Sequence, residues 1–168
     1  IENFKDKVSF LNFYNDINKI NFKEKPILLS INDGLIKKSK TNLSNLEHLT
    51  LISKSQFLLT APGADMPLCH HLIEAIKMKT IPISNYANLH HPNIESENYL
   101  SFNDYNSLKE SIIRALEMNN DGIKTIQDNL EKFYDDNLSP SSFLDKFENR
   151  TQNEIISCND VESLSWLD

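Results

Sequence analysis

Glycine and cysteine are both scarce in this sequence, and each shortage excludes a class of site. The three glycines, Gly34, Gly63 and Gly122, lie too far apart to form a GxGxxG or Walker-type phosphate loop. The two cysteines, Cys69 and Cys158, are too few and too widely separated for a disulfide scaffold or a zinc ribbon. Any nucleotide site must therefore be built without a glycine-rich loop, and the fold without a cysteine framework.

Long apolar segments and positive charge are lacking as well. No apolar run approaches the roughly 20 residues that cross a bilayer. Lysine and arginine number 17 against 24 acidic residues, giving a net charge of -7, so no general attraction to nucleic acid or anionic lipid is expected. A length of 168 residues favours one globular domain. We expect a cytoplasmic protein, and because the chain begins at Ile1 without a secretory signal, a fragment or a processed chain.

Apolar periodicity predicts alternating strands and helices. Helices are expected over residues 3–19, 44–54, from about 65 to 79, around 108–116, 123–133 and from 139 onward. Strands are expected over 27–31, 56–60, 80–84 and 98–102. In the third, Pro82 suggests an edge or terminal position, or marks where pairing ends. This alternation predicts an α/β, Rossmann-like parallel sheet flanked by helices over residues 1–150, followed by a polar tail over 151–168.

In such sheets ligands bind beyond the carboxyl ends of the strands. The helix predicted from about 65 to 79, which follows the strand over 56–60, is therefore the segment of interest. On a helical wheel one face of this helix is apolar, with Leu68, Cys69, Leu72, Ala75 and Ile76. His70, His71 and Glu74 lie on the other side. A helix that begins at a strand end directs its free amides and positive dipole end into the crevice, where they stabilise a phosphate. The alternative is an ordinary solvated helix face.

The same segment resembles exostosin-like glycosyltransferases. The residues that carry the resemblance are a strand over 56–60 with a Pro62-Gly63 end, a helix reading His-His-Leu-Ile-Glu-Ala-Ile over 70–76, and Thr-Ile-Pro-Ile over 80–83. The resemblance is good over about residues 50–85. Over the rest of the chain only the order of helices and strands is similar. Three positions depart from the family pattern: His70 and His71 replace arginines, and Lys79 replaces a glycine at the helix end.

The resemblance implies half of a GT-B fold, the C-terminal domain that binds a UDP- or GDP-linked sugar. It places Pro62, Gly63, His70, His71 and Glu74 at the donor, and we expect a loop with Asn85, His90 and His91 to contact the sugar. The implied activity is metal-independent hexosyl transfer to a glycan or lipid-linked acceptor in polysaccharide biosynthesis. In this family the acceptor's base normally comes from an N-terminal domain, for which this chain is too short, so no catalytic residue is assigned and the isolated domain is expected to bind donor with little or no transfer. Peripheral membrane association through such a domain is also implied.

Two other interpretations remain at this stage. A metal site is not expected. His70 and His71 are adjacent on a helix and point about 100° apart, so they cannot easily bind one ion together. A site with His90 or His91 would need a carboxylate folded close to them, and no Asp-x-Asp motif of metal-dependent sugar transferases is present. A noncatalytic α/β binding or interaction module, which keeps the architecture without the phosphate-binding arginines, is the alternative function.

Overall fold

The computed structural model describes residues 2–11, 21–24, 26–30, 43–60, 70–89 and 94–148. The chain divides into two compact units, residues 1–51 and 52–168, and each is described by itself. The expected single domain over 1–150 and the tail over 151–168 stay predictions, and the tail lies outside the described residues.

The first unit contains a pair of parallel strands near its start. The 3-10 helix η1 (Glu2–Lys7) leads into β1 (Val8–Leu11), which pairs with β2 (Ile27–Ser30) in the register Val8 to Ile27. The helix predicted over 3–19 is therefore wrong for Val8–Leu11, which form a strand; residues 3–7 belong to the 3-10 helix, and 12–19 lie outside the described residues. A short helix is marginal by itself, and pairing with a second apolar strand favours the extended form of Val8–Leu11. The strand predicted over 27–31 is confirmed for Ile27–Ser30.

Helix α1 (Asn45–Lys54) confirms the helix predicted over 44–54. Ser44 caps its start: the Ser44 Oγ atom accepts from the Glu47 amide at 3.3 Å, and Glu47 Oε2 accepts from the Ser44 amide at 2.8 Å. This reciprocal pair is a capping box, which satisfies two amides that have no helical partner. Leu51 and Ile52 form its buried side, whereas Leu46 is exposed.

The second unit is built on a three-stranded sheet. Its strands lie in the order β3-β4-β5, and all are parallel: β3 (Phe57–Thr60), β4 (Ile81–Ser84) and β5 (Leu100–Ser101). Helices flank the sheet, so the fold is α/β and Rossmann-like, as the sequence predicted. β5 has only two residues, where the apolar segment suggested five.

Of the two expectations for Pro82, the edge strand is wrong, because β4 is the central strand of the described sheet. The alternative, that Pro82 marks where pairing ends, agrees with the register of β4 and β5. The Ile81 amide donates to the Gln56 carbonyl on the β3 side. Since amides alternate sides along a strand, an amide at position 82 would point toward β5. Pairing with β5 begins only at Ile83, so the missing proline amide removes no ladder hydrogen bond.

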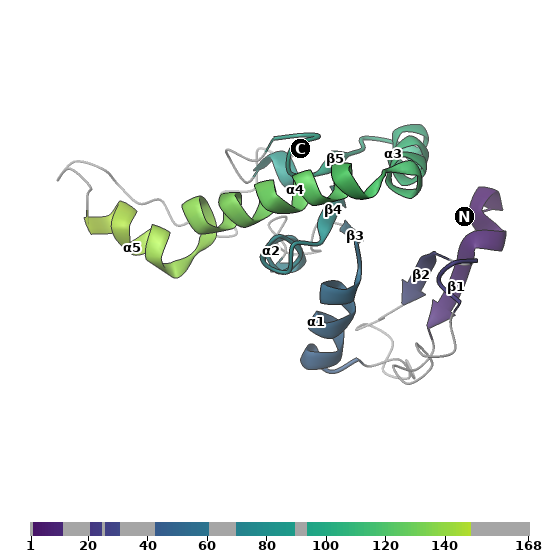
Figure 1. Cartoon of the computed structure of the whole chain (residues 1–168), viewed down its shortest axis with the longest axis horizontal. Helices are drawn as coiled ribbons and strands as arrows, with labels where there is room; N and C mark the ends of the chain where they lie inside the picture. The colour runs from purple at the N-terminus through teal and green to yellow at the C-terminus, as the bar shows by residue number, and fades with distance from the viewer. Residues whose placement is uncertain are drawn as a thin grey trace, which may run out of the picture. The chain divides into compact units, whose positions relative to one another are not determined.

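Four helices and two short helical segments complete the described part of this unit. They are α2 (His70–Lys77), η3 (Ala87–Leu89), α3 (Tyr105–Glu117), α4 (Asn120–Phe133), the π-helix η4 (Tyr134–Leu138) and α5 (Pro140–Glu148). α4 packs against α2 and β4; in Figure 1 it crosses α2, which is seen end-on, and continues through η4 into α5. The predicted helices after residue 104 are confirmed, with Asp104 and Asn119 as N-caps and Pro140 in the first turn of α5.

The main core lies where α2 and α4 meet the sheet. Leu72 and Ile76 of α2, Ile81 of β4 and Leu130 of α4 are fully buried in one cluster with Ile126. A smaller cluster joins Ile83 and Leu100 to Ala115 of α3. Burying each of these side chains stabilises the unit by about 1.5 to 3 kcal/mol, so the α2 position is fixed by its apolar face.

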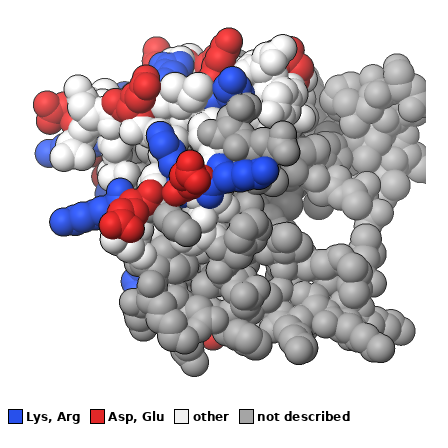
Figure 2. Space-filling model, turned by 90° about the vertical axis from the view of Figure 1, so that its right-hand side faces the viewer, with Lys and Arg blue, Asp and Glu red and all other residues white. Residues whose placement is uncertain are grey.

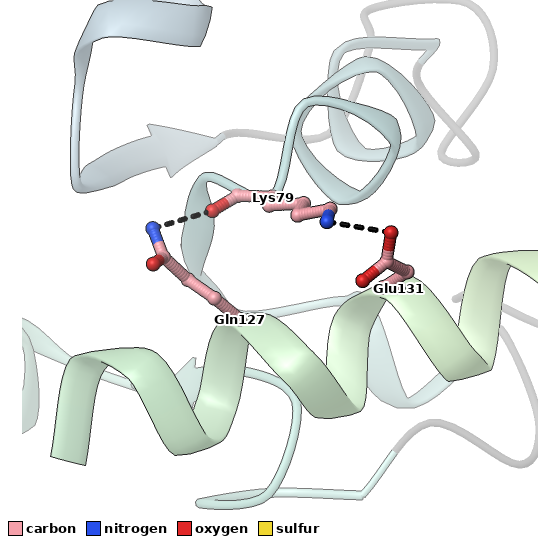
Figure 3. Close-up of polar contacts among 3 residues, drawn as sticks. All are labelled: Lys79, Gln127 and Glu131. Atoms are coloured by element: carbon pink, nitrogen blue, oxygen red, sulfur yellow. Dashed lines mark hydrogen bonds and ion pairs between the residues drawn. The ribbon is translucent and has the colours of Figure 1, made fainter. Parts of the chain in front are cut away.

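The turn between α2 and β4 uses a left-handed lysine. Lys79 has a φ of 57°, the Thr80 amide donates to the Ala75 carbonyl, and the Lys79 amide donates to the Ile76 carbonyl. This is a Schellman motif, whose left-handed position usually holds glycine. Figure 3 shows how α4 secures it: Gln127 Nε2 donates to the Lys79 carbonyl at 3.0 Å, and Lys79 Nζ lies 2.6 Å from Glu131 Oε1.

Candidate functional site

A row of hydroxyl side chains ends the three-stranded sheet. Thr60, Ser84 and Ser101 are the last residues of β3, β4 and β5, and the register pairs Thr60 with Ser84 and Ser84 with Ser101. Residues at paired positions point to the same face of a sheet. Thr60 and Ser84 are buried, whereas Ser101 is partly exposed. All three strands thus end in a residue with a hydroxyl group, and of the three only Ser101 is accessible to solvent.

Each hydroxyl group in the row takes part in a hydrogen bond. Thr60 Oγ1 donates to the Ile83 carbonyl at 3.5 Å, and Ser84 Oγ accepts from the Tyr86 amide at 3.2 Å. Ser101 Oγ donates to Glu95 Oε1 at 2.5 Å. These bonds fix the rotamers of the row, so the edge is ordered before any ligand binds.

Helix α2 belongs to the connection between β3 and β4. Because these strands are parallel, the connection returns from the carboxyl end of β3 to the amino end of β4, and a turn of three residues, 78–80, joins the end of α2 to the start of β4. The end of α2 therefore lies at the amino side of β4, and its first described residue, His70, lies toward the carboxyl edge, where the positive end of a helix dipole favours an anion.

The two faces of α2 differ as the sequence predicted. Leu72, Ala75 and Ile76 are fully buried, whereas His70 is exposed and His71 is partly buried. The rings of the two histidines meet edge to face with centroids 4.3 Å apart. Both imidazoles therefore stand together at the start of the helix.

Glu74 differs from an ordinary solvated helix residue. Its side chain is partly buried, and its Oε2 atom is shielded from solvent. It lies one turn beyond His70, at the spacing at which helical side chains are neighbours. One oxygen of this carboxylate is therefore buried, while the side chain as a whole is only partly so.

The remaining predicted site residues fall into two groups. Asn85 is described: it is exposed and follows Ser84 directly, so it lies at the same edge of the sheet. Pro62, Gly63, His90 and His91 lie outside the described residues, and their assignment to the site stays a prediction.

Both acidic and basic side chains lie on the surface of the described residues. On the face that Figure 2 shows, acidic and basic side chains of the described residues are interspersed. Close to the end of the sheet, burial raises the pKa of Tyr99, and the nearby negative charge of Glu95 raises it further. A carboxylate therefore acts on the β5 end of the sheet.

Sequence reasoning missed the hydroxyl row and Glu95. The signal for the row is present in the sequence, since each of the three predicted strands places Thr or Ser at or near its end: Leu59-Thr60, Ile83-Ser84 and Leu100-Ser101. Glu95 carries no comparable signal, because only the register of β5 and the loop before it bring its carboxylate to Ser101.

Comparisons with known proteins identify no relative: no protein-family description, curated protein or solved structure matches the chain. Among the residues that the structure describes, none of the helices has the length and apolar character needed to cross a membrane.

Proposed function

We propose that the carboxyl edge of the β3-β4-β5 sheet binds the nucleoside diphosphate of a UDP- or GDP-linked sugar. The observation that carries the proposal is the placement of α2, whose first described residue lies toward the carboxyl edge and which turns His70, His71 and Glu74 away from its buried face. The helix amides and the two imidazoles provide the electrostatic stabilisation of the diphosphate. Glu74 accepts hydrogen bonds from the ribose hydroxyls.

The same groups support sugar transfer. In the transfer step the acceptor oxygen forms a bond to the anomeric carbon, and the bond between that carbon and the diphosphate oxygen breaks. The electron pair leaves with the diphosphate, whose growing negative charge the helix amides and imidazolium groups stabilise. The acceptor's proton goes to a base that the resemblance to exostosin-like enzymes places in a separate domain. The proposed role of this chain is thus donor binding and leaving-group stabilisation in a glycosyltransferase.

One observation favours a second function, a binding module without catalysis. At two positions where exostosin-like enzymes have arginines, this chain has histidines, which lack the bidentate fork of arginine and are charged only in part near neutral pH. Such a module would bind the donor and leave it intact.

Binding of nucleoside diphosphates tests the proposal. We expect UDP or GDP at millimolar concentration to raise the melting temperature of the full chain, because a ligand that binds only the folded state stabilises it. Inorganic phosphate at the same ionic strength is the control for a nonspecific salt effect. Failure of UDP, GDP and their sugar conjugates to stabilise the chain beyond phosphate would overturn the proposal. Binding with no release of the sugar to any acceptor would favour the noncatalytic module.

A further inference from the structure

The β5 end of the hydroxyl row carries an ordered carboxylate. Ser101, the last residue of β5, donates its hydroxyl hydrogen to Glu95 Oε1 at 2.5 Å. Through Ser84, Ser101 shares the register of Thr60, so Glu95 reaches the same carboxyl edge from the outer side of β5. The carboxylate belongs to the edge where the donor site is proposed, although it is six residues away from Ser101 in sequence.

The loop that carries Glu95 is held from several sides. Glu95 forms an isolated parallel bridge with Tyr99, and the Ser96 amide donates to the Tyr99 carbonyl at 2.8 Å. Arg114 of α3 donates to Ser96 Oγ at 3.1 Å. Asn129 of α4 donates to the Glu97 carbonyl at 3.0 Å. Two helices of the second unit thus fix the loop, and the position of the Glu95 backbone is set before a ligand arrives.

The Glu95 side chain nevertheless remains accessible. It is exposed, and an ionised carboxylate has about four lone-pair sites, of which the Ser101 hydroxyl occupies one. Its charge reaches the buried ring of Tyr99. An accessible carboxylate with a fixed position is an acceptor for ligand hydroxyl groups, because charge-assisted hydrogen bonds are about twice as strong as neutral ones.

The charges along the edge suit the diphosphate and the sugar of a ligand at different positions. His70 and His71 lie at the start of α2, which follows β3, whereas Glu95 lies at β5. Neighbouring strands are about 4.8 Å apart, so the two ends of the row are separated by about 10 Å. Glu95 repels a diphosphate but accepts hydrogen bonds from the hydroxyl groups of a sugar. The diphosphate is therefore expected beside α2, at the ends of β3 and β4, and the sugar toward β5.

We propose that Glu95, positioned by Ser101, is a further binding residue of this site and accepts hydrogen bonds from the hydroxyl groups of the donor sugar. The inference rests on the proposed function and deepens it, because it assigns the sugar to a carboxylate at the β5 end of the sheet. Ser101 is a positioning residue, which acts through Glu95.

The test compares UDP with UDP-glucose and GDP with GDP-mannose by calorimetry on the full chain. Glu95→Gln keeps the shape of the side chain and removes its charge. We expect it to weaken nucleotide-sugar binding about tenfold and to leave the affinity for the free nucleotide within about twofold. Ser101→Ala should weaken only the nucleotide sugar, and by less. Glu97→Gln is the matched control, since Glu97 is an exposed acid in the same loop.

The outcomes separate this inference from the proposed function. If the wild-type chain binds none of the four ligands, both fail. If it binds nucleotides and Glu95→Gln leaves nucleotide-sugar affinity unchanged, or lowers the affinity for nucleotide and nucleotide sugar equally, only the role of Glu95 is overturned. An equal effect of Glu97→Gln would also overturn it, because net charge would then be the cause. Urea unfolding of each variant confirms that it folds.

Discussion

Gln127 of α4 caps the left-handed Lys79 at the end of α2: its Nε2 atom donates to the Lys79 carbonyl oxygen at 3.0 Å. The two residues are 48 positions apart in the sequence, and the bond satisfies a carbonyl just after the end of α2. Since α2 carries the candidate site, this contact helps to determine where His70 and Glu74 lie relative to the sheet.

The Gln127 bond is expected to contribute more to stability than the ion pair beside it. Gln127→Ala should lower the free energy of unfolding by about 1 kcal/mol, because it removes a partly buried hydrogen bond. Glu131→Ala should lower it by less than about 0.5 kcal/mol, because Lys79 and Glu131 are 44% and 52% exposed and water screens the pair. Urea unfolding of the two variants measures the difference, and the reverse ranking would contradict this account.

The left-handed backbone of Lys79 is expected to favour glycine at this position. Lys79→Gly and Lys79→Ala both lose the ion pair with Glu131, but only alanine keeps a Cβ atom at a φ of 57°. We expect the glycine variant to be more stable than the alanine variant by about 1 kcal/mol. Thermal and urea unfolding compare them. Equal stability of the two variants would show that the Cβ atom adds no strain here.

Asp104, the N-cap of α3, is expected to make stability depend on acid pH. A hydrogen bond from the Ser107 amide, and then one from its hydroxyl group, hold the pKa of Asp104 below its usual value of 3.8. Because the folded pKa is the lower one, the stabilisation is present above the usual pKa and is lost as pH falls through the lowered value. Urea midpoints of the wild type and Asp104→Asn, measured from about pH 7 to about pH 2, should converge at low pH. A constant difference between them would be contrary to this prediction.

Nucleotide binding is expected to weaken as pH rises past about 7, since histidine ordinarily loses its positive charge near this range. His70 and His71 lie together at the start of α2, with Glu74 one turn away on the same helix. Calorimetric titrations of UDP or GDP at several pH values should show this trend in the wild type. The double variant His70→Gln and His71→Gln should bind with a flat pH profile. A profile shared by both proteins would place the imidazoles away from the phosphates.

Glu74 is expected to contribute directly to nucleotide affinity. Removing a charge-assisted hydrogen bond to ribose costs about 1.5 to 3 kcal/mol, so Glu74→Ala should raise the dissociation constant roughly 10- to 150-fold. Glu110→Ala, an exposed acid on α3, is the matched control and should change it less than about twofold. Because Glu74 is partly buried, Glu74→Gln is measured as well, with urea unfolding of all three variants. Equal effects at Glu74 and Glu110 would attribute the change to net charge.

Local patterns were sufficient to predict much of the second unit. Asp104 and Asn119 each precede a run with helical spacing, and both cap the predicted helix through a hydrogen bond to an amide three residues ahead. The α/β class followed from the alternation of short apolar runs and amphipathic helices, and so did the buried face of α2. These features depend on residues within one or two turns of each other, and a single sequence contains that information.

Tertiary structure decided what depends on distant partners. The same apolar residues of Val8–Leu11 fit a helix or a strand, and pairing with Ile27–Ser30 decided for the strand. Pro82 is compatible with an edge or a centre, and the short length of β5 allowed it in the centre. Glu95 reached Ser101 only through the fold of its loop. Sequence by itself determined the helices and strands of the second unit, apart from the length of β5, and the charge of each side chain. Register and packing decided which charged side chains lie close together, because strand pairing and helix packing join residues that no local spacing relates.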